Sequence, residues 1–118
     1  MPKYHIPKTL YYNITQLAKE NNTTITKQII FCVDYARKNL YNSNLLPQHI
    51  TEQILASVSQ YHHQPGITLR PGYTSPALID YLNKNQLSPE DFIKYLHYGS
   101  LYKRIEERRE LLNAKSTD

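Results

Sequence analysis

The segment KQIIFCVDYARKNL, residues 27–40, decides the fold of this chain. Apolar side chains recur along it at the 3.6-residue period of a helix, and much of the opposite side is apolar as well. A helix that is apolar almost all round must be buried on two sides. The main stripe, which begins just before the segment, is Ile25, Ile29, Val33, Ala36 and Leu40, and the second group is Ile30, Phe31, Cys32 and Tyr35.

A first helix precedes this one. Residues 7–19 place apolar side chains on one face, and Pro7 suits a helix entrance. The segment ENNTT (20–24) then favours a turn, because short polar side chains bond nearby backbone amides. We therefore expect the second helix to start at Thr24 or Thr26. The face of the first helix consists of Leu10, Ile14, Leu17 and Ala18.

The opening residues predict a short strand. Tyr4 and Ile6 alternate with Lys3 and His5, which is the two-residue period of a strand. Segments of about 40 residues rarely bury such an apolar helix without a metal, disulfides or a partner chain. We infer a homodimer in which the strand, lacking a neighbour in its own chain, pairs with its copy.

The remaining chain predicts further helices. Pro47 indicates a boundary, so the expected domains are residues 1–42 for dimerisation and residues 43–118 for oligomerisation, possible tetramer formation or partner binding. Two Pro-Gly pairs in YHHQPGITLRPGYTSP (61–76) favour a structured loop over any regular element. The fold class is mainly α, and the expected helices are 47–60, 76–84 capped by Ser75, one capped by Ser88, and one along 101–112.

The positive charge is unevenly distributed. Residues 1–42 hold six Lys/Arg against two acids, and residues 43–118 hold eight against eight, which accounts for all 14 basic and 10 acidic residues and the net charge of +4. A local positive excess favours polyanions such as nucleic acid, and a solubilising face is the alternative. The single Cys32 and the lack of a long apolar run predict a cytoplasmic protein without a disulfide or membrane span.

The order of strand, helix, turn and helix resembles the ribbon-helix-helix (Arc/MetJ-like) family of DNA-binding proteins over residues 1–40. The matching features are Tyr4 and Ile6 as inward strand positions, Pro7 opening the first helix, its core stripe, and KENNTTITKQI (19–29) as the turn and the second helix start. The resemblance implies an intertwined dimer whose two strands form an antiparallel ribbon that enters the major groove of double-stranded DNA.

The resemblance also assigns roles to residues. Because strand side chains alternate, Lys3 and His5 are expected to face the DNA bases. A phosphate contact or solvent exposure is the alternative for Lys3, and a packing or solvent role is the alternative for His5. The amides near Thr23, Thr24 and Ile25, at the start of the second helix, are expected to bind a phosphate, with Lys8 and Lys27 flanking that site. Solvated surface is the alternative for these lysines. Family members commonly offer three outward strand residues, and this shorter strand predicts weaker sequence selectivity.

Other site chemistries find little support in the sequence. His62 and His63 are interpreted as loop histidines, because a spaced set of metal ligands is lacking. Cys32 lies within the buried pattern, where a thiol is usually inert. We expect no enzyme activity, no cofactor and no metal. A tyrosine-rich region is interpreted as helical core and rim, with a second nucleic-acid surface as the alternative; it comprises Tyr73, Tyr81, Tyr95, Tyr98 and Tyr102.

The leading functional expectation is operator binding as a transcriptional repressor or autoregulator. One alternative is a plasmid mobilisation (conjugation) accessory factor that binds a transfer origin and recruits a relaxase through the C-terminal part. Another is an antitoxin whose C-terminal part binds a toxin. The last is a protein-interaction module with no nucleic-acid role.

Overall fold

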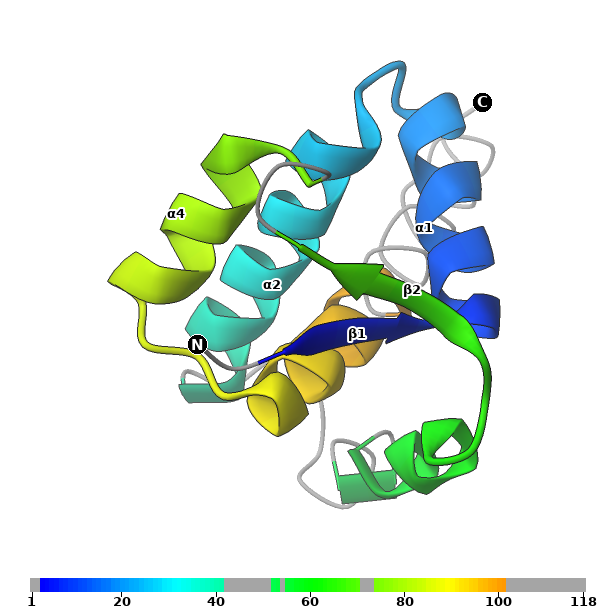
Figure 1. The fold of residues 1–118 in the computed structure, drawn as a ribbon. Helices are drawn as coiled ribbons and strands as arrows, with labels where there is room; N and C mark the ends of the chain where they lie inside the picture. The colour runs from blue at the N-terminus through cyan, green and yellow to red at the C-terminus, as the bar shows by residue number, and fades with distance from the viewer. Residues whose placement is uncertain (1–2, 42–51, 54, 71–73, 102–118) are drawn as a thin grey trace, which may run out of the picture.

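The computed structural model describes residues 3–41, 52–53, 55–70 and 74–101. Its elements are β1 (Tyr4–Pro7), α1 (Lys8–Glu20), α2 (Ile25–Tyr41), the 3₁₀ helix η1 (Ser57–Tyr61), β2 (Gly66–Leu69) and α4 (Pro76–Lys84), followed by a helix over residues 89–101. The expectation of a mainly helical fold is confirmed. Figure 1 shows α4 on the left, α1 on the right and α2 between them, with helix 89–101 passing behind β1.

The helices begin and end where local chemistry places them. Thr24 accepts a hydrogen bond through Oγ1 from the backbone N–H of Lys27 at 3.2 Å, which caps the start of α2. Ser88 accepts one in the same way from the N–H of Asp91 at 3.1 Å, which confirms the predicted cap of helix 89–101. α4 has the predicted bounds, and Pro76 lies in its first turn. The predicted side-chain cap is absent, because the Ser75 hydroxyl makes no capping hydrogen bond and only the Ser75 carbonyl oxygen accepts from the first turn of α4. α1 starts one residue later than predicted, because Pro7 ends β1.

The core lies between α1, α2 and the C-terminal helices. The predicted face of α1 is buried, and Ile29, Cys32, Val33 and Ala36 of α2 are buried too. Phe31 is an exception, since 48% of it is exposed. The core draws residues from both sides of the predicted boundary at residue 42, including Leu78, Leu82, Phe92 and Leu96.

α2 approaches helix 89–101 closely at Gly99. A Cβ at this position would lie 2.0 Å from the carbonyl oxygen of Cys32. Glycine therefore allows the two backbones to come together, and it does so without an unusual backbone angle. Helix 89–101 therefore covers one side of α2, and α1 and α4 also pack against α2.

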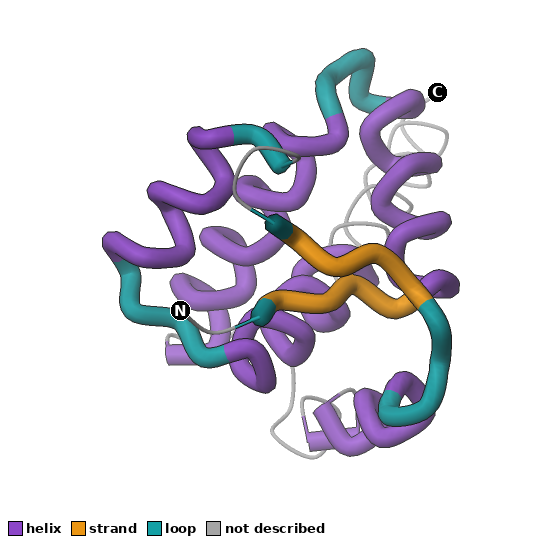
Figure 2. Tube along the Cα trace, in the orientation of Figure 1, coloured by secondary structure: helices purple, strands orange, loops and turns teal. Residues whose placement is uncertain are grey.

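The two strands form an antiparallel ribbon within one chain. The register pairs Tyr4 with Leu69, His5 with Thr68, Ile6 with Ile67 and Pro7 with Gly66. Figure 2 shows the two strands side by side across the front of the helices. Two expectations were therefore wrong: β1 has a strand partner in its own chain, and residues 61–76 contain a regular element.

Other expectations fall partly or wholly outside the described residues. Of the predicted helix 47–60, residues 52–53 and 55–56 are helical and lead into η1, and Val58 is buried. Residues 102–112 of the predicted last helix lie outside. Among the tyrosines of the C-terminal region, Tyr98 is buried and Tyr81 and Tyr95 are half-buried, while Tyr73 and Tyr102 lie outside.

Candidate nucleic-acid interface

The inner face of the ribbon is anchored to the core. Tyr4 and Ile6 are buried, as predicted. The Tyr4 hydroxyl donates a hydrogen bond to the carbonyl oxygen of Leu87, and its ring packs edge-on against Phe92 at a centroid distance of 5.6 Å. Burial raises the pKa of Tyr4 above its ordinary value. These contacts fix which face of β1 points outward.

The outer face of the ribbon is polar and basic. His5 and Thr68 are cross-strand partners on this face, and the His5 ring lies 3.5 Å from Thr68 Oγ1 through Nδ1 and 3.4 Å from the Gln64 carbonyl oxygen through Nε2. Lys3 and Arg70 are both exposed and flank the Tyr4–Leu69 pair. Strand alternation places both of them on the outer side with His5.

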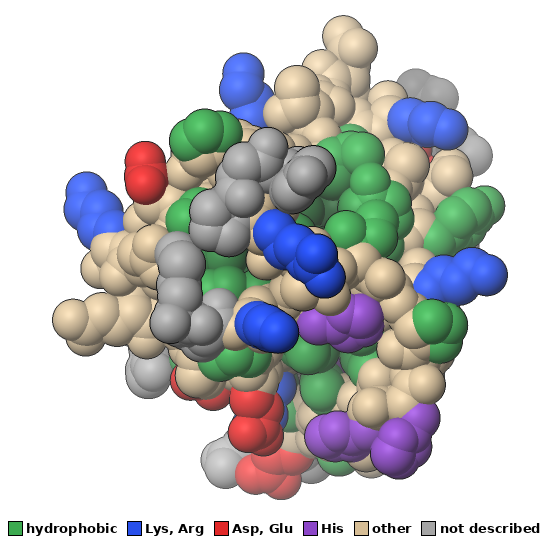
Figure 3. Space-filling view, in the orientation of Figure 1, with side chains coloured by type: hydrophobic (Ala, Val, Ile, Leu, Met, Phe, Trp, Pro, Cys, Tyr) green, Lys and Arg blue, Asp and Glu red, His purple; other side chains and the backbone are tan. Residues whose placement is uncertain are grey.

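Figure 3 looks onto this outer face. Lys, Arg and His side chains gather over the two strands, and the Asp and Glu side chains in view lie away from them. The structure therefore brings together Lys3 and His5, which the sequence singled out, with Thr68 and Arg70, which it did not. Strand alternation in ITL (67–69), after Gly66, was the available signal, but three residues are too few to establish a strand period.

The base of the ribbon is joined to α1. The N–H of Lys8 donates to the carbonyl oxygen of Pro65 at 2.9 Å, and the N–H of Thr9 donates to Gln64 Oε1 at 3.3 Å. These bonds satisfy amides that the first turn of α1 leaves without intrahelical partners. The segment before β2 thus fixes the ribbon on the N-terminus of α1.

The start of α2 forms a separate polar site. Thr23, Lys27, Gln28 and two neighbours line a cavity of about 280 Å³ beside the first turn. The amide of Thr23 donates to the carbonyl oxygen of Ala18 at 2.9 Å, so it is already engaged. Within the described residues, no such acceptor is found for the amides of Thr24 and Ile25. A helix N-terminus with such amides favours an anion.

Lys8 does not flank this site within one chain. It is the first residue of α1, whereas the start of α2 follows the other end of that helix. At 1.5 Å per residue, α1 separates the two positions by about 18 Å. Lys27, in contrast, lines the cavity itself. Of the two predicted flanking lysines, only Lys27 is close to the predicted phosphate site.

The histidine and cysteine side chains of the described residues were the candidates for metal binding. In the part of the chain that the structure describes, no three His, Cys, Asp or Glu side chains are grouped to hold a metal ion. His62 and His63 are exposed, and Cys32 is buried, where its Sγ accepts a hydrogen bond from Gln28 Nε2 at 3.4 Å.

Of the described helices, none combines the length and apolar character needed to cross a membrane.

Comparisons with protein-family models, with curated proteins and with solved structures found no match for this chain.

Proposed function

We propose that the protein binds double-stranded DNA, with the outer face of the β1–β2 ribbon in the major groove, and that it acts as a transcriptional repressor or autoregulator. The observation that supports this proposal is the basic outer face formed by Lys3, His5, Thr68 and Arg70. The major groove is wide enough to admit a two-stranded ribbon. The ribbon differs from the family pattern because its second strand comes from the same chain.

Each side chain has a chemical role in this proposal. Arg70 and Lys3 donate to guanine O6 and N7 or to phosphates. The Thr68 hydroxyl can bond to a donor or to an acceptor on a base edge. His5 donates or accepts according to its tautomer once a ring nitrogen leaves Thr68 or the Gln64 carbonyl oxygen. The free amides of Thr24 and Ile25, together with Lys27, bind a backbone phosphate and fix the register of the protein on the duplex.

The experiment is a titration of a fluorescent duplex at several salt concentrations. For the wild-type protein, log K should fall linearly with log salt, because phosphate contacts release counterions. If Lys3 and Arg70 contact phosphates, the double variant Lys3→Ala/Arg70→Ala should reduce the slope by about 1.8, since each contact contributes about 0.9. If they contact bases, the slope stays and the preference between duplex sequences is lost.

The control removes the same charge elsewhere. Lys38 and Lys84 are exposed near the C-terminal ends of α2 and α4. The variant Lys38→Ala/Lys84→Ala should retain both the slope and the sequence preference. If both double variants lose the same duplex affinity, the effect comes from net charge and not from the ribbon. Undetectable duplex binding at low salt would overturn the proposal. Sequencing the DNA fragments that the protein selects from a mixture then shows whether it binds a promoter, as a repressor does, or a transfer origin, as a mobilisation factor does.

A further inference from the structure

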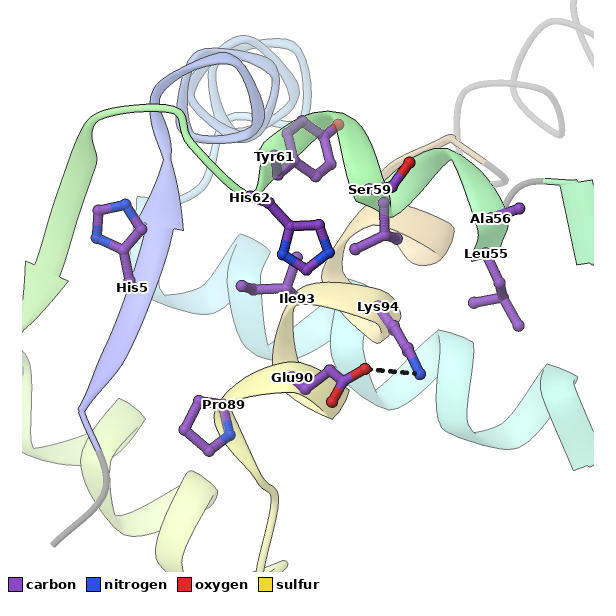
Figure 4. Close-up of a pocket in the computed structure, with 11 residues that line it drawn as sticks. His5, Leu55, Ala56, Ser59, Tyr61, His62, Pro89, Glu90, Ile93 and Lys94 are labelled. Carbon is purple, nitrogen blue, oxygen red and sulfur yellow. Dashed lines mark ion pairs between the residues drawn. The ribbon is translucent and has the colours of Figure 1, made fainter.

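A cavity of about 430 Å³ lies between β1, η1 and the start of helix 89–101. Figure 4 shows side chains from these three elements around it, with His5 on one side and Lys94 on another. Pockets that hold small molecules usually range from about 300 to 1,000 Å³ and combine apolar walls with a few polar groups. This cavity has both the size and the lining of such a site.

The walls of the cavity are apolar. Val58 and Tyr61 of η1 contribute side chains that are almost fully buried, and Ile93 contributes from the facing helix. Tyr61 is held in place because its hydroxyl lies 2.8 Å from Nδ1 of the buried His97. His97 Nε2 in turn lies 2.6 Å from Ser57 Oγ. The wall formed by η1 is therefore fixed to helix 89–101 by hydrogen bonds as well as by packing.

The fixed donor at the rim is the Lys94 ammonium group, whereas His5 and His62 donate or accept according to their tautomers. His5, His62 and Lys94 line the cavity, and 39% of the Lys94 side chain is exposed. The acceptor among the charged groups is Glu90, which is 3.3 Å from Lys94 Nζ and 74% exposed in its side chain. An ammonium group has three donors, so Lys94 can hold Glu90 and a second carboxylate at once.

We propose that this cavity binds a small carboxylate with an aromatic or branched aliphatic body. The body fills the space between Val58, Tyr61 and Ile93, and the carboxylate accepts from Lys94 and His62. A cationic ligand would lie beside the Lys94 ammonium, and a neutral one would leave Lys94 with Glu90 as its charged partner. The match between donors and ligand charge selects the anion.

Occupancy of the cavity also affects the ribbon through His5. This side chain lines the cavity and belongs to the outer face of the ribbon, so a ligand packed beside it hinders the ring movement that a contact between His5 and a base requires. This step rests on the proposed function, whereas ligand binding does not. Because coupling between two sites is reciprocal, DNA should weaken ligand binding by the same factor by which the ligand weakens DNA binding.

The test uses phenylacetate, with phenylacetamide as its neutral isostere and benzylamine as a cation, and follows amide shifts by NMR of the full chain. Phenylacetate should shift the signals of η1 and helix 89–101 saturably and bind about tenfold more tightly than either analogue. Lys94→Met should reduce its affinity to that of the amide. Glu90→Gln should tighten binding, because it removes a competing carboxylate.

Two variants complete the design. Lys84→Met removes a charge on α4, away from the cavity, and should bind like wild type. Ala56→Phe adds a ring at an exposed position in the cavity lining, so it should abolish binding while the thermal midpoint stays unchanged. The absence of saturable shifts, equal binding of the three probes, or an unchanged affinity in Lys94→Met would overturn the proposal.

Repeating the titration with a duplex present separates the two proposals. Equal phenylacetate affinity with and without bound duplex overturns the coupling through His5. If no duplex binds, the proposed function fails, and phenylacetate binding is still measured.

Discussion

Replacing Gly99 by alanine sets two physical effects against each other. Alanine has the higher helix propensity, by about 1 kcal/mol in a helix interior, which on its own raises the free energy of unfolding. The added Cβ, however, would lie 2.0 Å from the carbonyl oxygen of Cys32 and 2.6 Å from its carbonyl carbon. The sign of the measured change shows which effect is larger.

The size of the steric effect follows from these distances. Backbone atoms cannot rotate away as a long side chain can, so α2 and helix 89–101 must separate by on the order of 1 Å, and dispersion contacts fall steeply with such gaps. The affected residues include Cys32, Ala36 and Tyr98, all of which are buried. Overpacking of a core typically costs about 1–3 kcal/mol, occasionally more. We expect Gly99→Ala to lower the free energy of unfolding by about 3 kcal/mol, at the upper end of the range for overpacking, because the clash is with backbone atoms.

The measurement is urea unfolding followed by circular dichroism, with the slope of free energy against urea compared between variants. Asn83→Ala, at an exposed position of α4, is the control for propensity alone and should stabilise by about 0.5 kcal/mol. A Gly99→Ala variant as stable as wild type, or more stable, would refute the close approach of the two helices.

Two further predictions concern the helix cap and alkaline pH. Thr24→Ala removes the acceptor of the Lys27 N–H and should lower the free energy of unfolding by about 1 kcal/mol in urea, whereas Thr23→Ala should change it by less than about 0.5. Burial raises the pKa of Tyr4 and Tyr61 in the folded state, so the stability that their neutral hydroxyls contribute is complete below about pH 10 and lost as the pH rises through the raised values. Absorbance at high pH should show tyrosines that ionise later than a free tyrosine amide, and Tyr4→Phe should remove one of them; simultaneous ionisation of all tyrosines would contradict this.

The predictable part of the fold was determined by short-range chemistry. The apolar face of α1, the cap at Thr24, and the Ser-Pro starts at Ser75 and Ser88 each depend on residues within about one helical turn of one another. A single amino-acid sequence contains all the residues on which such short-range signals depend. The main helices were therefore placed within about two residues.

The strand partner could not be predicted in this way. β1 and β2 pair across some 60 residues of sequence. Each strand contains four residues, so the alternation of apolar and polar side chains is too brief to identify either strand. Loop signals from Pro65 and Gly66 are genuine, since Gly66 lies against the Ile6 carbonyl where a Cβ would be 2.0 Å away. The same glycine that suggested a loop is what allows the ribbon to close, which is why Thr68 and Arg70 were missed.

A partner strand from the same chain changes what dimerisation must accomplish. A strand has two hydrogen-bonding edges, and β1 uses one of them for β2. A second copy that paired through β1 would have to use the other edge or displace β2, and Tyr4 already binds Leu87 and packs on Phe92 from the adjoining helix. The ribbon itself therefore does not require a dimer. The dimer expected from the sequence would serve a different purpose: it would place two complete ribbons on neighbouring turns of the duplex, where symmetric half-sites are read together.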